Sequence, residues 1–208
     1  MRKVAVTGGL ACGKTTVCRF LKEFGAFVIS ADTIVHQLLS EDKATANAVI
    51  DLLGPGIVRS NTIDRIEVAK RVFGDPSLLE ALEKLLHPRV HQEVFRLYEE
   101  VRTKDIPLFV VEIPLLFEVK MDSDYDATIA VVSSEALCRA RFANVGKAGD
   151  DFDIRSKRQL PLDEKAKRAT YVLVNNGTLK ELYQATCVLF KSLTNPQKEP
   201  QVDEPRNR

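Results

Sequence analysis

The stretch GGLACGKT, residues 8–15, decides the fold of this 208-residue chain. It satisfies the pattern G-x4-G-K-[ST] at every defined position. Its glycines let the backbone turn tightly, so that consecutive N–H groups point inward at an anion. A helix that opens directly after the loop adds the positive end of its dipole. The pattern therefore predicts a loop that binds the phosphates of a nucleoside triphosphate.

The residues of this loop have separate roles. The ammonium of Lys14 can reach the β- and γ-phosphates, and the hydroxyl of Thr15 can ligate the Mg²⁺ that bridges them. Cys12 is either a nucleophile, if the loop lowers its pKa, or a small residue tolerated at an unspecified position. We expect ATP, a co-substrate bound with Mg²⁺, to be held by Gly8, Gly9, Ala11, Cys12, Gly13, Lys14, Thr15 and Thr16.

The segments on either side of the loop have the pattern of strands and a helix. Residues 3–7 (KVAVT) form a short β-branched run that predicts a buried strand. Apolar residues with helical spacing follow over 15–24, and Gly25 ends that helix. Residues 26–30 (AFVIS) predict a second strand. A strand–helix–strand unit of this kind forces the two strands to run parallel.

The remainder of the chain continues this alternation. Further strands are predicted over 108–113, 127–132 and 171–175, and further helices over 134–144 and 179–193. The pattern over 32–101 is mostly helical, with breaks at 54–56 and 74–76, and residues 144–153 are polar and expected to be flexible. The five strands predict an α/β fold, and the long helical excursion has the character of a substrate-side insertion.

Composition and charge give no reason to expect several kinds of partner. Thirty Lys and Arg residues oppose 29 Asp and Glu, so the net charge of +1 gives no reason to expect nucleic acid or an anionic membrane. No apolar run approaches the roughly 20 residues of a membrane span. The four cysteines have no paired spacing, which predicts reduced thiols in a cytoplasmic protein. Residues 195–208, with three prolines and many charges, predict a disordered tail.

Two acidic residues at the ends of predicted strands are candidates for chemistry. Asp32 comes directly after the second strand, at the sheet edge where ligands bind, and Lys14 should lie at the same edge. The carboxylate of Asp32 can accept the proton of an attacking hydroxyl, or it can cap a helix that begins at Thr33. Glu112 ends the run Phe109–Val111. It can hold the Mg²⁺ shell through water, or pair with a buried basic residue.

A basic segment separates the fourth and fifth predicted strands. An arginine-bearing flap here can close over a triphosphate and neutralise developing charge, although most exposed cations only solvate helix faces. Arg139 and Arg155 are the candidates that we select from this segment. His87 and His91 are four apart but lack a third metal ligand, and Pro88 is expected to place His87 at a helix boundary.

Several separate blocks of the sequence resemble the dephospho-CoA kinase family, from about Lys3 to Leu193. They are VTGG (6–9) with GKTT (13–16), Ala31-Asp32, LHP (86–88), PLLFE (114–118), and Gln159 with NNG (175–177). The phosphate-binding loop is shared by many families, whereas LHP and PLLFE at these distances are selective. The chain departs from the family pattern at Ala143-Asn144, where arginine and aspartate are common, and at Glu112 and Val174, where aspartate is common.

The resemblance implies a P-loop NTPase-type three-layer α/β fold with a five-stranded parallel sheet, a helical substrate-binding insertion and a lid. A single kinase domain, 1–194, would comprise a core of about 1–31, 107–140 and 170–194, a CoA-binding region of about 32–106 and a lid of about 141–169. The implied reaction moves the γ-phosphoryl group of ATP to the ribose 3′-hydroxyl of dephospho-CoA, the last step of CoA synthesis. ATP and dephospho-CoA are then the expected partners of a monomeric enzyme.

The same resemblance assigns roles to single residues. Asp32 matches the family's general base, and Lys14 and Arg139 complete the catalytic group. Two lid arginines, Arg139 and Arg155, are expected to approach the ATP. Asn175, at the last strand, would lie near the adenine. The acceptor is expected to be bordered by Asp32, His87, Leu115 and Phe117.

Two other functions compete with this one. A GTPase switch needs a guanine-reading NKxD segment, and none occurs in the sequence. Another small-molecule P-loop kinase, acting on a nucleoside monophosphate or a metabolite hydroxyl, would differ only in its substrate region. The LHP and PLLFE blocks favour dephospho-CoA.

Overall fold

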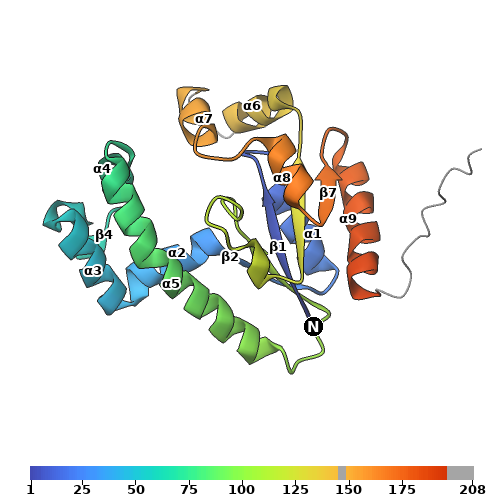
Figure 1. The fold of residues 1–208 in the computed structure, drawn as a ribbon, viewed down its shortest axis with the longest axis horizontal. Coiled ribbons are helices and arrows are strands. Elements are labelled where there is room, and N and C mark those ends of the chain that lie inside the picture. The colour runs from blue at the N-terminus through green and yellow to red at the C-terminus, as the bar shows by residue number, and fades with distance from the viewer. Residues whose placement is uncertain (145–148, 196–208) are drawn as a thin grey trace, which may run out of the picture. The chain divides into compact units, whose positions relative to one another are not determined.

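The structure, a computed structural model, describes residues 1–144 and 149–195 (Figure 1). The internal contacts divide the chain into one unit of Met1–Val28 with Asp105–Arg208 and a second unit of Ile29–Lys104. Each unit has its own apolar core. Apart from Asn195, the tail that we predicted to be disordered lies outside the described residues. Within those residues, no helix combines the length and the apolar character needed to cross a bilayer.

Five strands form one parallel sheet. They are β1 (Arg2–Gly8), β2 (Phe27–Ser30), β5 (Leu108–Glu112), β6 (Ala127–Val132) and β7 (Tyr171–Val174), in the spatial order β2-β5-β1-β6-β7. β1 pairs in parallel with both of its neighbours, so that Val4 lies opposite Val110 of β5 and Ala127 of β6. The predicted sheet is confirmed, and no strand end differs from its predicted position by more than one residue.

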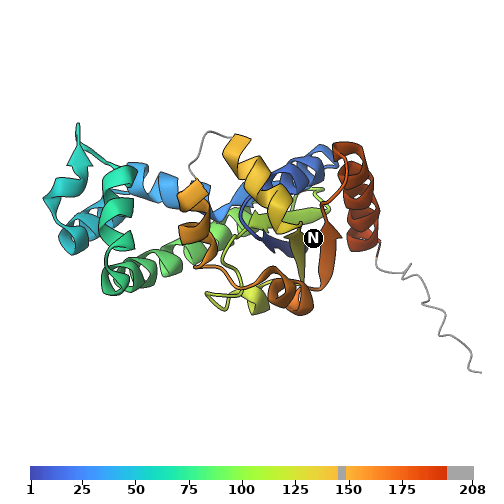
Figure 2. The same ribbon diagram turned by 90° about the horizontal axis from the view of Figure 1, so that it is seen from above.

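Helices cover both faces of the sheet, which is why its central strands are apolar throughout rather than alternating. Fully buried residues line both faces: Val4, Val6, Val110 and Ile129 on one, and Ala5, Phe109, Val111 and Ala130 on the other. α1 (Lys14–Glu23) packs against α9 (Leu179–Thr194) on one face, while α8 (Leu162–Arg168) lies against β1 and β6 on the other (Figure 2).

Aromatic side chains hold α1 and α9 together. The ring of Tyr183 meets Phe20 and Phe24 edge-on, with centroids 5.0 and 5.1 Å apart. α9 begins with a capping box, in which Thr178 and Glu181 each accept a backbone N–H of the other residue. The remaining elements of this unit are the 3-10 turn η2 (Asp122–Asp124), α6 (Glu135–Asn144) and α7 (Gly149–Ser156).

α7 occupies part of the segment that we predicted to be polar and flexible. The helix covers 149–156, while residues 145–148 lie outside the described chain. Its anchor is Phe152, which is buried and packs edge-on against Phe142 of α6 with ring centroids 5.5 Å apart. One aromatic side chain in an otherwise polar segment therefore fastens α7 to α6.

The second unit is helical apart from one short hairpin that the sequence pattern did not reveal. Its elements are α2 (Ala31–Glu41), α3 (Lys43–Leu53), the 3-10 turn η1 (Pro55–Ile57), β3 (Val58–Arg59), β4 (Thr62–Ile63), α4 (Arg65–Phe73) and α5 (Pro76–Val101). Asp42, Asp64 and Asp75 accept the first N–H groups of α3, α4 and α5 and so fix where these helices begin. The hairpin strands have two residues each, too few to show an alternating pattern.

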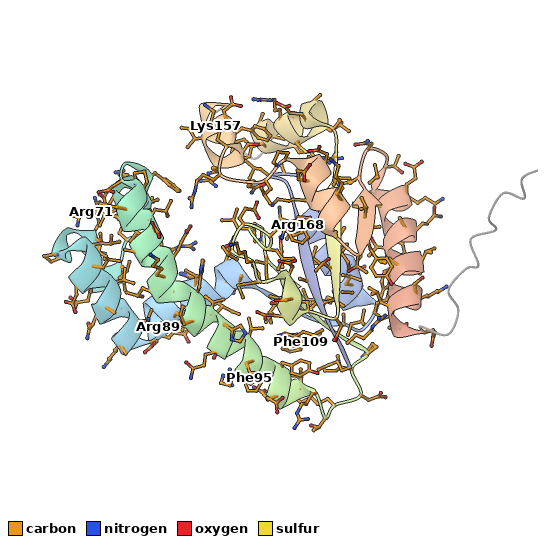
Figure 3. All side chains as sticks on the ribbon, viewed as in Figure 1. Arg71, Arg89, Phe95, Phe109, Lys157 and Arg168 are labelled. Atoms are coloured by element: carbon orange, nitrogen blue, oxygen red, sulfur yellow. The ribbon has the colours of Figure 1, made fainter. Side chains whose placement is uncertain are left out.

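The prediction that Pro88 places His87 at a helix boundary is wrong. α5 runs unbroken through both residues, although an internal proline removes one N–H and crowds the carbonyl four residues back. Beside it, the guanidinium of Arg89 (labelled in Figure 3) donates to the carbonyl of Leu85 at 2.6 Å. The burial of apolar residues on both sides of the proline outweighs the local cost of the lost hydrogen bond. These residues are Leu82, Leu86, Val90 and Val94.

Candidate active site

The phosphate-binding loop joins β1 to α1 and has a backbone conformation that depends on its glycines. Gly8 has a φ of 143° and Gly13 a φ of 100°, and Ala11 between them has a φ of 56°. A β-carbon at Gly8 would collide with the carbonyl oxygen of Val131 in β6. Glycine is therefore required at residue 8 both for its φ and for the close approach of the neighbouring strand.

Several N–H groups of the loop are available to a ligand. Within 1–144 and 149–195, no protein acceptor takes the N–H of Leu10, Ala11, Gly13 or Thr15. The N–H of Cys12, by contrast, donates to the carbonyl of Gly9 at 3.3 Å and closes the turn. Available N–H groups around a turn at a helix N-terminus form an anion-binding arrangement. The loop thus has the geometry that the sequence motif predicts.

Lys14 supplies the positive charge of this arrangement. Its side chain is buried, and Nζ donates to the carbonyls of Gly9 at 2.8 Å and Gly8 at 3.3 Å. A buried ammonium in a loop with available N–H groups places positive charge where a phosphate would bind. The position of Lys14 therefore favours anion binding inside the loop.

Thr15 and Glu112 form a direct contact between α1 and β5. Thr15 Oγ1 donates a hydrogen bond of 2.9 Å to Glu112 Oε1. Glu112 is the last residue of β5 and lies opposite Val6 of β1, so the sheet register places its carboxylate next to the loop. Burial, and next the negative charge of Glu112, raise the pKa of the nearby Cys18 thiol, which therefore stays protonated. The structure thus brings together Thr15, the predicted metal ligand, and Glu112, the carboxylate predicted to hold the metal shell.

Asn175, just after β7, holds the loop from another side. Its Nδ2 donates to the carbonyl of Cys12 at 2.8 Å, and a β-carbon at Gly13 would collide with that Nδ2. Arg141 of α6 in turn donates to the carbonyl of Asn175 at 2.9 Å and to Ser133 Oγ at 3.0 Å. We expected Asn175 near an adenine, and the structure shows its amide supporting the loop backbone. Arg141 is a residue that the sequence did not single out among the cations of its segment.

Asp32 is the second residue of α2, in the second unit. The N-cap of that helix is Ser30, so the alternative that Asp32 caps a helix beginning at Thr33 is wrong. The side chain of Asp32 is exposed, and no hydrogen bond or ion pair engages it within the described part of the chain. The role of Asp32 as a general base remains a prediction.

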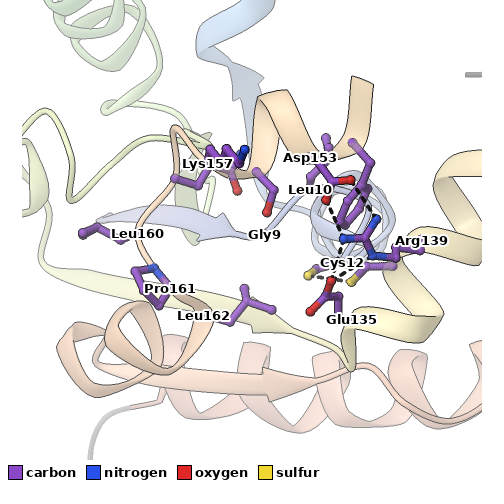
Figure 4. Close-up of a pocket in the computed structure, with 14 residues that line it drawn as sticks. Gly9, Leu10, Cys12, Glu135, Arg139, Asp153, Lys157, Leu160, Pro161 and Leu162 are labelled. Atoms are coloured by element: carbon purple, nitrogen blue, oxygen red, sulfur yellow. Dashed lines mark hydrogen bonds and ion pairs between the residues drawn. The ribbon is translucent and has the colours of Figure 1, made fainter. Parts of the chain in front are cut away.

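A pocket of about 420 Å³ opens beside the loop, entirely within the first unit (Figure 4). Its walls come from the loop, from α6 and α7, and from the segment that leads into α8. The residues that line it are Gly9, Leu10, Cys12, Glu135, Cys138, Arg139, Phe152, Asp153, Ser156, Lys157, Gln159, Leu160, Pro161 and Leu162. The pocket adjoins the loop that would hold the phosphates, so it is the candidate site for part of the nucleotide.

Of the two predicted lid arginines, the structure brings Arg139 to this pocket. Its guanidinium donates to both carboxylate oxygens of Asp153, at 2.5 and 3.3 Å, and to Glu135 at 2.8 Å. It also lies over the ring of Phe152, 4.7 Å from the centroid. Arg155 is in the last turn of α7 with an exposed side chain, and it is not among the described residues that line the pocket. The Asp153 partner was not foreseen from the sequence.

A buried ion pair holds the wall that faces the loop. Lys165 of α8 is fully buried, and its Nζ donates to Glu118 at 2.9 Å and to the carbonyl of Pro114 at 2.7 Å. Burial lowers the pKa of Lys165, and the Glu118 carboxylate opposes that shift. Glu118 also accepts the N–H of Leu160, a pocket residue, at 2.7 Å. The PLLFE block thus contains a structural partner that its apolar residues did not reveal.

The predicted acceptor residues lie in different parts of the fold. Leu115 and Phe117 follow β5 in the first unit, whereas His87 belongs to α5 in the second. Leu115 and His87 are half-buried, and Phe117 is buried. The guanidinium of Arg168 (labelled in Figure 3) lies 4.5 Å from the centroid of the Phe117 ring and covers it. Their contact with an acceptor remains a prediction.

The parallel sheet, the glycine-dependent loop between β1 and α1, and the buried Lys14 beside the Thr15–Glu112 contact define a P-loop kinase. The chain belongs to the dephospho-CoA kinase family, whose family model, described as dephospho-CoA kinase, matches residues 2–181. A protein of that name from Protochlamydia amoebophila is 45% identical over 196 residues, which cover 93% of this chain and 97% of the relative.

Solved structures share this fold. A crystal structure of a Thermus thermophilus protein superposes with a TM-score of 0.79 at 32% identity, covering 93% of this chain and 98% of the other. A dephospho-CoA kinase from Campylobacter jejuni superposes with a TM-score of 0.71 at 22% identity, covering 94% and 98%, and supports the fold.

Proposed function

We propose that this chain transfers the γ-phosphoryl group of ATP to the ribose 3′-hydroxyl of dephospho-CoA, giving CoA and ADP in the final step of CoA synthesis. The observation that carries the proposal is the loop 8–15, with available N–H groups and a buried Lys14, in a chain of the dephospho-CoA kinase family. The loop accounts for the phosphate donor, and the family accounts for the acceptor.

The loop would hold the triphosphate by charge and by hydrogen bonds. Its N–H groups would donate to phosphate oxygens, and the positive end of α1 would face the same anion. Lys14 would exchange its hydrogen bonds to the carbonyls of Gly8 and Gly9 for bonds to the β- and γ-phosphates. Because phosphoryl transfer involves little covalent chemistry by the protein, this positioning would supply much of the catalysis.

The contact between Thr15 and Glu112 fits a magnesium site at the loop. Thr15 and Glu112 would hold Mg²⁺ when it is bound with ATP, and the ion would supply positive charge to the phosphates during transfer. The Thr15 oxygen can ligate the ion through a lone pair while its O–H continues to donate to Glu112, because the two interactions use different sites on one hydroxyl. Glu112 would then orient the ligand and accept hydrogen bonds from water around the ion.

Asp32 would act on the acceptor hydroxyl. A carboxylate that accepts the proton of the 3′-hydroxyl would make its oxygen a better nucleophile toward the γ-phosphorus. The support for this role is the family relationship and the position of Asp32 directly after β2, where it is exposed and does not serve as the helix N-cap.

Arg139 would neutralise charge on the transferring group. It already lines the pocket beside the loop, held by Asp153 and Glu135 on one side. An arginine carries five N–H donors, so phosphate oxygens can be added to or exchanged for these partners. Arg155 would act from the same lid. The proposal also includes a lid of about 141–169 and a CoA-binding region of about 32–106.

The acceptor would be bordered by His87, Leu115 and Phe117, with Asn175 supporting the nucleotide side. A monomeric enzyme is part of this proposal. The four cysteines are free thiols, which agrees with a reducing cytoplasm.

An ADP-release assay tests the acceptor. Dephospho-CoA, AMP, CMP, shikimate and gluconate would be offered in parallel with Mg²⁺ and ATP. We expect turnover with dephospho-CoA alone. Turnover of another acceptor with none of dephospho-CoA would overturn the proposal and favour the alternative of a different small-molecule kinase.

A further inference from the structure

Two cysteine thiols meet between the phosphate-binding loop and α6. The sulfur atoms of Cys12 and Cys138 lie 3.1 Å apart, joined by a hydrogen bond that crosses 126 residues of sequence (Figure 4). Cys12 is the residue before Gly13 in the loop, and Cys138 directly precedes Arg139. The pair therefore connects the phosphate site to the helix that carries the candidate charge-neutralising arginine.

The pocket is the route by which a reagent would reach this pair. Both side chains have almost no solvent exposure, 0% for Cys12 and 2% for Cys138, yet both line the pocket. A large disulfide reagent would have to displace the pocket walls, whereas a small peroxide would not. This limits the chemical class of oxidant to small hydroperoxides.

The surroundings favour a thiolate at Cys12. The hydrogen bond from Cys138, and next the positive charge of Lys14, lower the pKa of the Cys12 thiol to about 7, although burial acts in the opposite direction. The same contact and burial raise the pKa of Cys138. Cys12 is therefore the sulfur that would react first, because the thiolate is the nucleophilic form.

We infer that Cys12 and Cys138 form a peroxide-reactive dithiol site, whose oxidation to a disulfide ties the phosphate-binding loop to α6 and switches the enzyme off. The Cys12 thiolate attacks one peroxide oxygen, the O–O bond breaks, and Cys12 becomes a sulfenic acid while the other oxygen leaves as hydroxide and takes up a proton. The Cys138 sulfur then attacks the Cys12 sulfur, the S–O bond breaks, and water leaves with the Cys138 proton. In sum, two thiols lose two electrons and two protons to one hydrogen peroxide, which becomes two waters.

The new bond would displace the loop. A disulfide is about 2.05 Å long, so the two sulfurs would move together by about 1 Å. The Cys12 carbonyl accepts a hydrogen bond from Asn175, so a shift of the loop backbone would strain that bond. A shift of about 1 Å in a positioning element can cost about a hundredfold in rate. This loss of activity rests on the proposed function, whereas formation of the disulfide does not.

The other two cysteines are suited to be controls. Cys18 is buried, and that burial raises the pKa of its thiol and keeps it in the unreactive form. Cys187 lies half-buried on α9, outside the pocket-lining set of the described residues. The selectivity of the reaction for Cys12 and Cys138 is therefore a prediction that peptide mapping can check.

The first experiment maps the bond in the full chain. The protein is treated with hydrogen peroxide, free thiols are alkylated after denaturation, and tryptic peptides are identified without reduction. We expect a linked pair of peptides, 4–14 and 121–139, and the loss of two hydrogens in the intact mass. The variant Cys138→Ser should lack the link and retain a trappable sulfenic acid at Cys12. Separate peptides 4–14 and 121–139 in oxidised wild-type protein would overturn the inference.

The second experiment measures activity of the same samples. We expect oxidised wild-type protein and the Cys187→Ser variant to lose at least about tenfold in kcat/KM for ATP and to regain it with dithiothreitol. The melting temperature should not fall on oxidation, which would separate the switch from unfolding. A linked protein with unchanged kcat/KM would overturn the switch. A protein without kinase activity before oxidation would instead contradict the proposed function, and the peptide map would still report on the disulfide.

Discussion

The hydroxyl of Thr15, in the first turn of α1, donates a 2.9 Å hydrogen bond to the carboxylate of Glu112 at the end of β5. The contact joins residues that are 97 positions apart, and it arises because β1 and β5 are neighbours in the sheet. It leaves a lone pair of the Thr15 oxygen available to a metal ion. The proposed magnesium site depends on this pair.

Replacing Glu112 tests the metal role directly. We expect Glu112→Gln to weaken the apparent affinity for Mg²⁺ by about 10–100-fold, because the amide lacks the negative charge that orients water around the ion. Glu112→Asp should retain most activity, since it keeps the carboxylate. The measurement is kcat as a function of Mg²⁺ concentration at saturating substrates. An unchanged magnesium requirement in Glu112→Gln would remove Glu112 from the site.

Lys14→Ala should reduce kcat/KM for ATP by about 10²–10³-fold, because it removes the cation that faces the β- and γ-phosphates. The matched control is Lys22→Ala, which removes an exposed lysine from the last turn of the same helix. Steady-state kinetics of the two variants would be compared at equal protein stability. If Lys22→Ala lost as much activity as Lys14→Ala, the effect would belong to the helix and not to the loop.

The buried pair of Lys165 and Glu118 should matter for stability. Lys165→Met leaves a buried carboxylate without its cation and should lower the free energy of unfolding by about 3–5 kcal/mol. The double variant Lys165→Met/Glu118→Leu should recover most of that loss, since no unpaired charge remains. Urea unfolding measures both. The control Lys167→Met removes an exposed lysine from the same helix, and it should leave the free energy of unfolding nearly unchanged.

Additive losses in the double variant would contradict this account of the ion pair. They would mean that Lys165 and Glu118 stabilise the protein independently, through their bonds to the carbonyl of Pro114 and the N–H of Leu160.

Arg139→Ala should lower kcat by about 10–100-fold with a smaller change in KM for ATP, because a charge that stabilises the transferring group acts mainly in the transition state. Arg19→Ala is the control, since Arg19 is an exposed arginine of α1 whose charge lies on a helix face. Steady-state kinetics separate kcat from KM. A variant with normal kcat and a raised KM would assign Arg139 to ground-state binding only.

The parts of the fold that were predictable from sequence are those set by local pattern. The strand ends of the sheet follow from apolar runs, and the loop follows from its glycines and from Lys14 and Thr15. The exception is the second unit, where Pro88 predicts a helix boundary that α5 does not have. There the burial of apolar residues on both sides of the proline keeps α5 continuous.

The parts that were not predictable depend on contacts between distant segments. Lys165 has the same local sequence environment as the exposed Lys167, and only the packing of α8 against the segment after β5 buries it. Arg141 and Asp153 are likewise ordinary surface residues by pattern, and their partners Asn175 and Arg139 come from other elements. The loop motif singles out Cys12 as a candidate nucleophile, whereas Cys138 comes from a distant helix and carries no local signal that pairs it with Cys12.

Analysis of the product tests the proposed reaction. Purified protein would be incubated with Mg²⁺, ATP and dephospho-CoA, and the products analysed by mass spectrometry and phosphorus NMR. We expect equal amounts of ADP and CoA, with the new phosphate as a monoester on the ribose 3′-oxygen, and no CoA from Lys14→Ala. Release of ADP with no phosphorylated acceptor, or a phosphate on another hydroxyl, would contradict the proposed reaction.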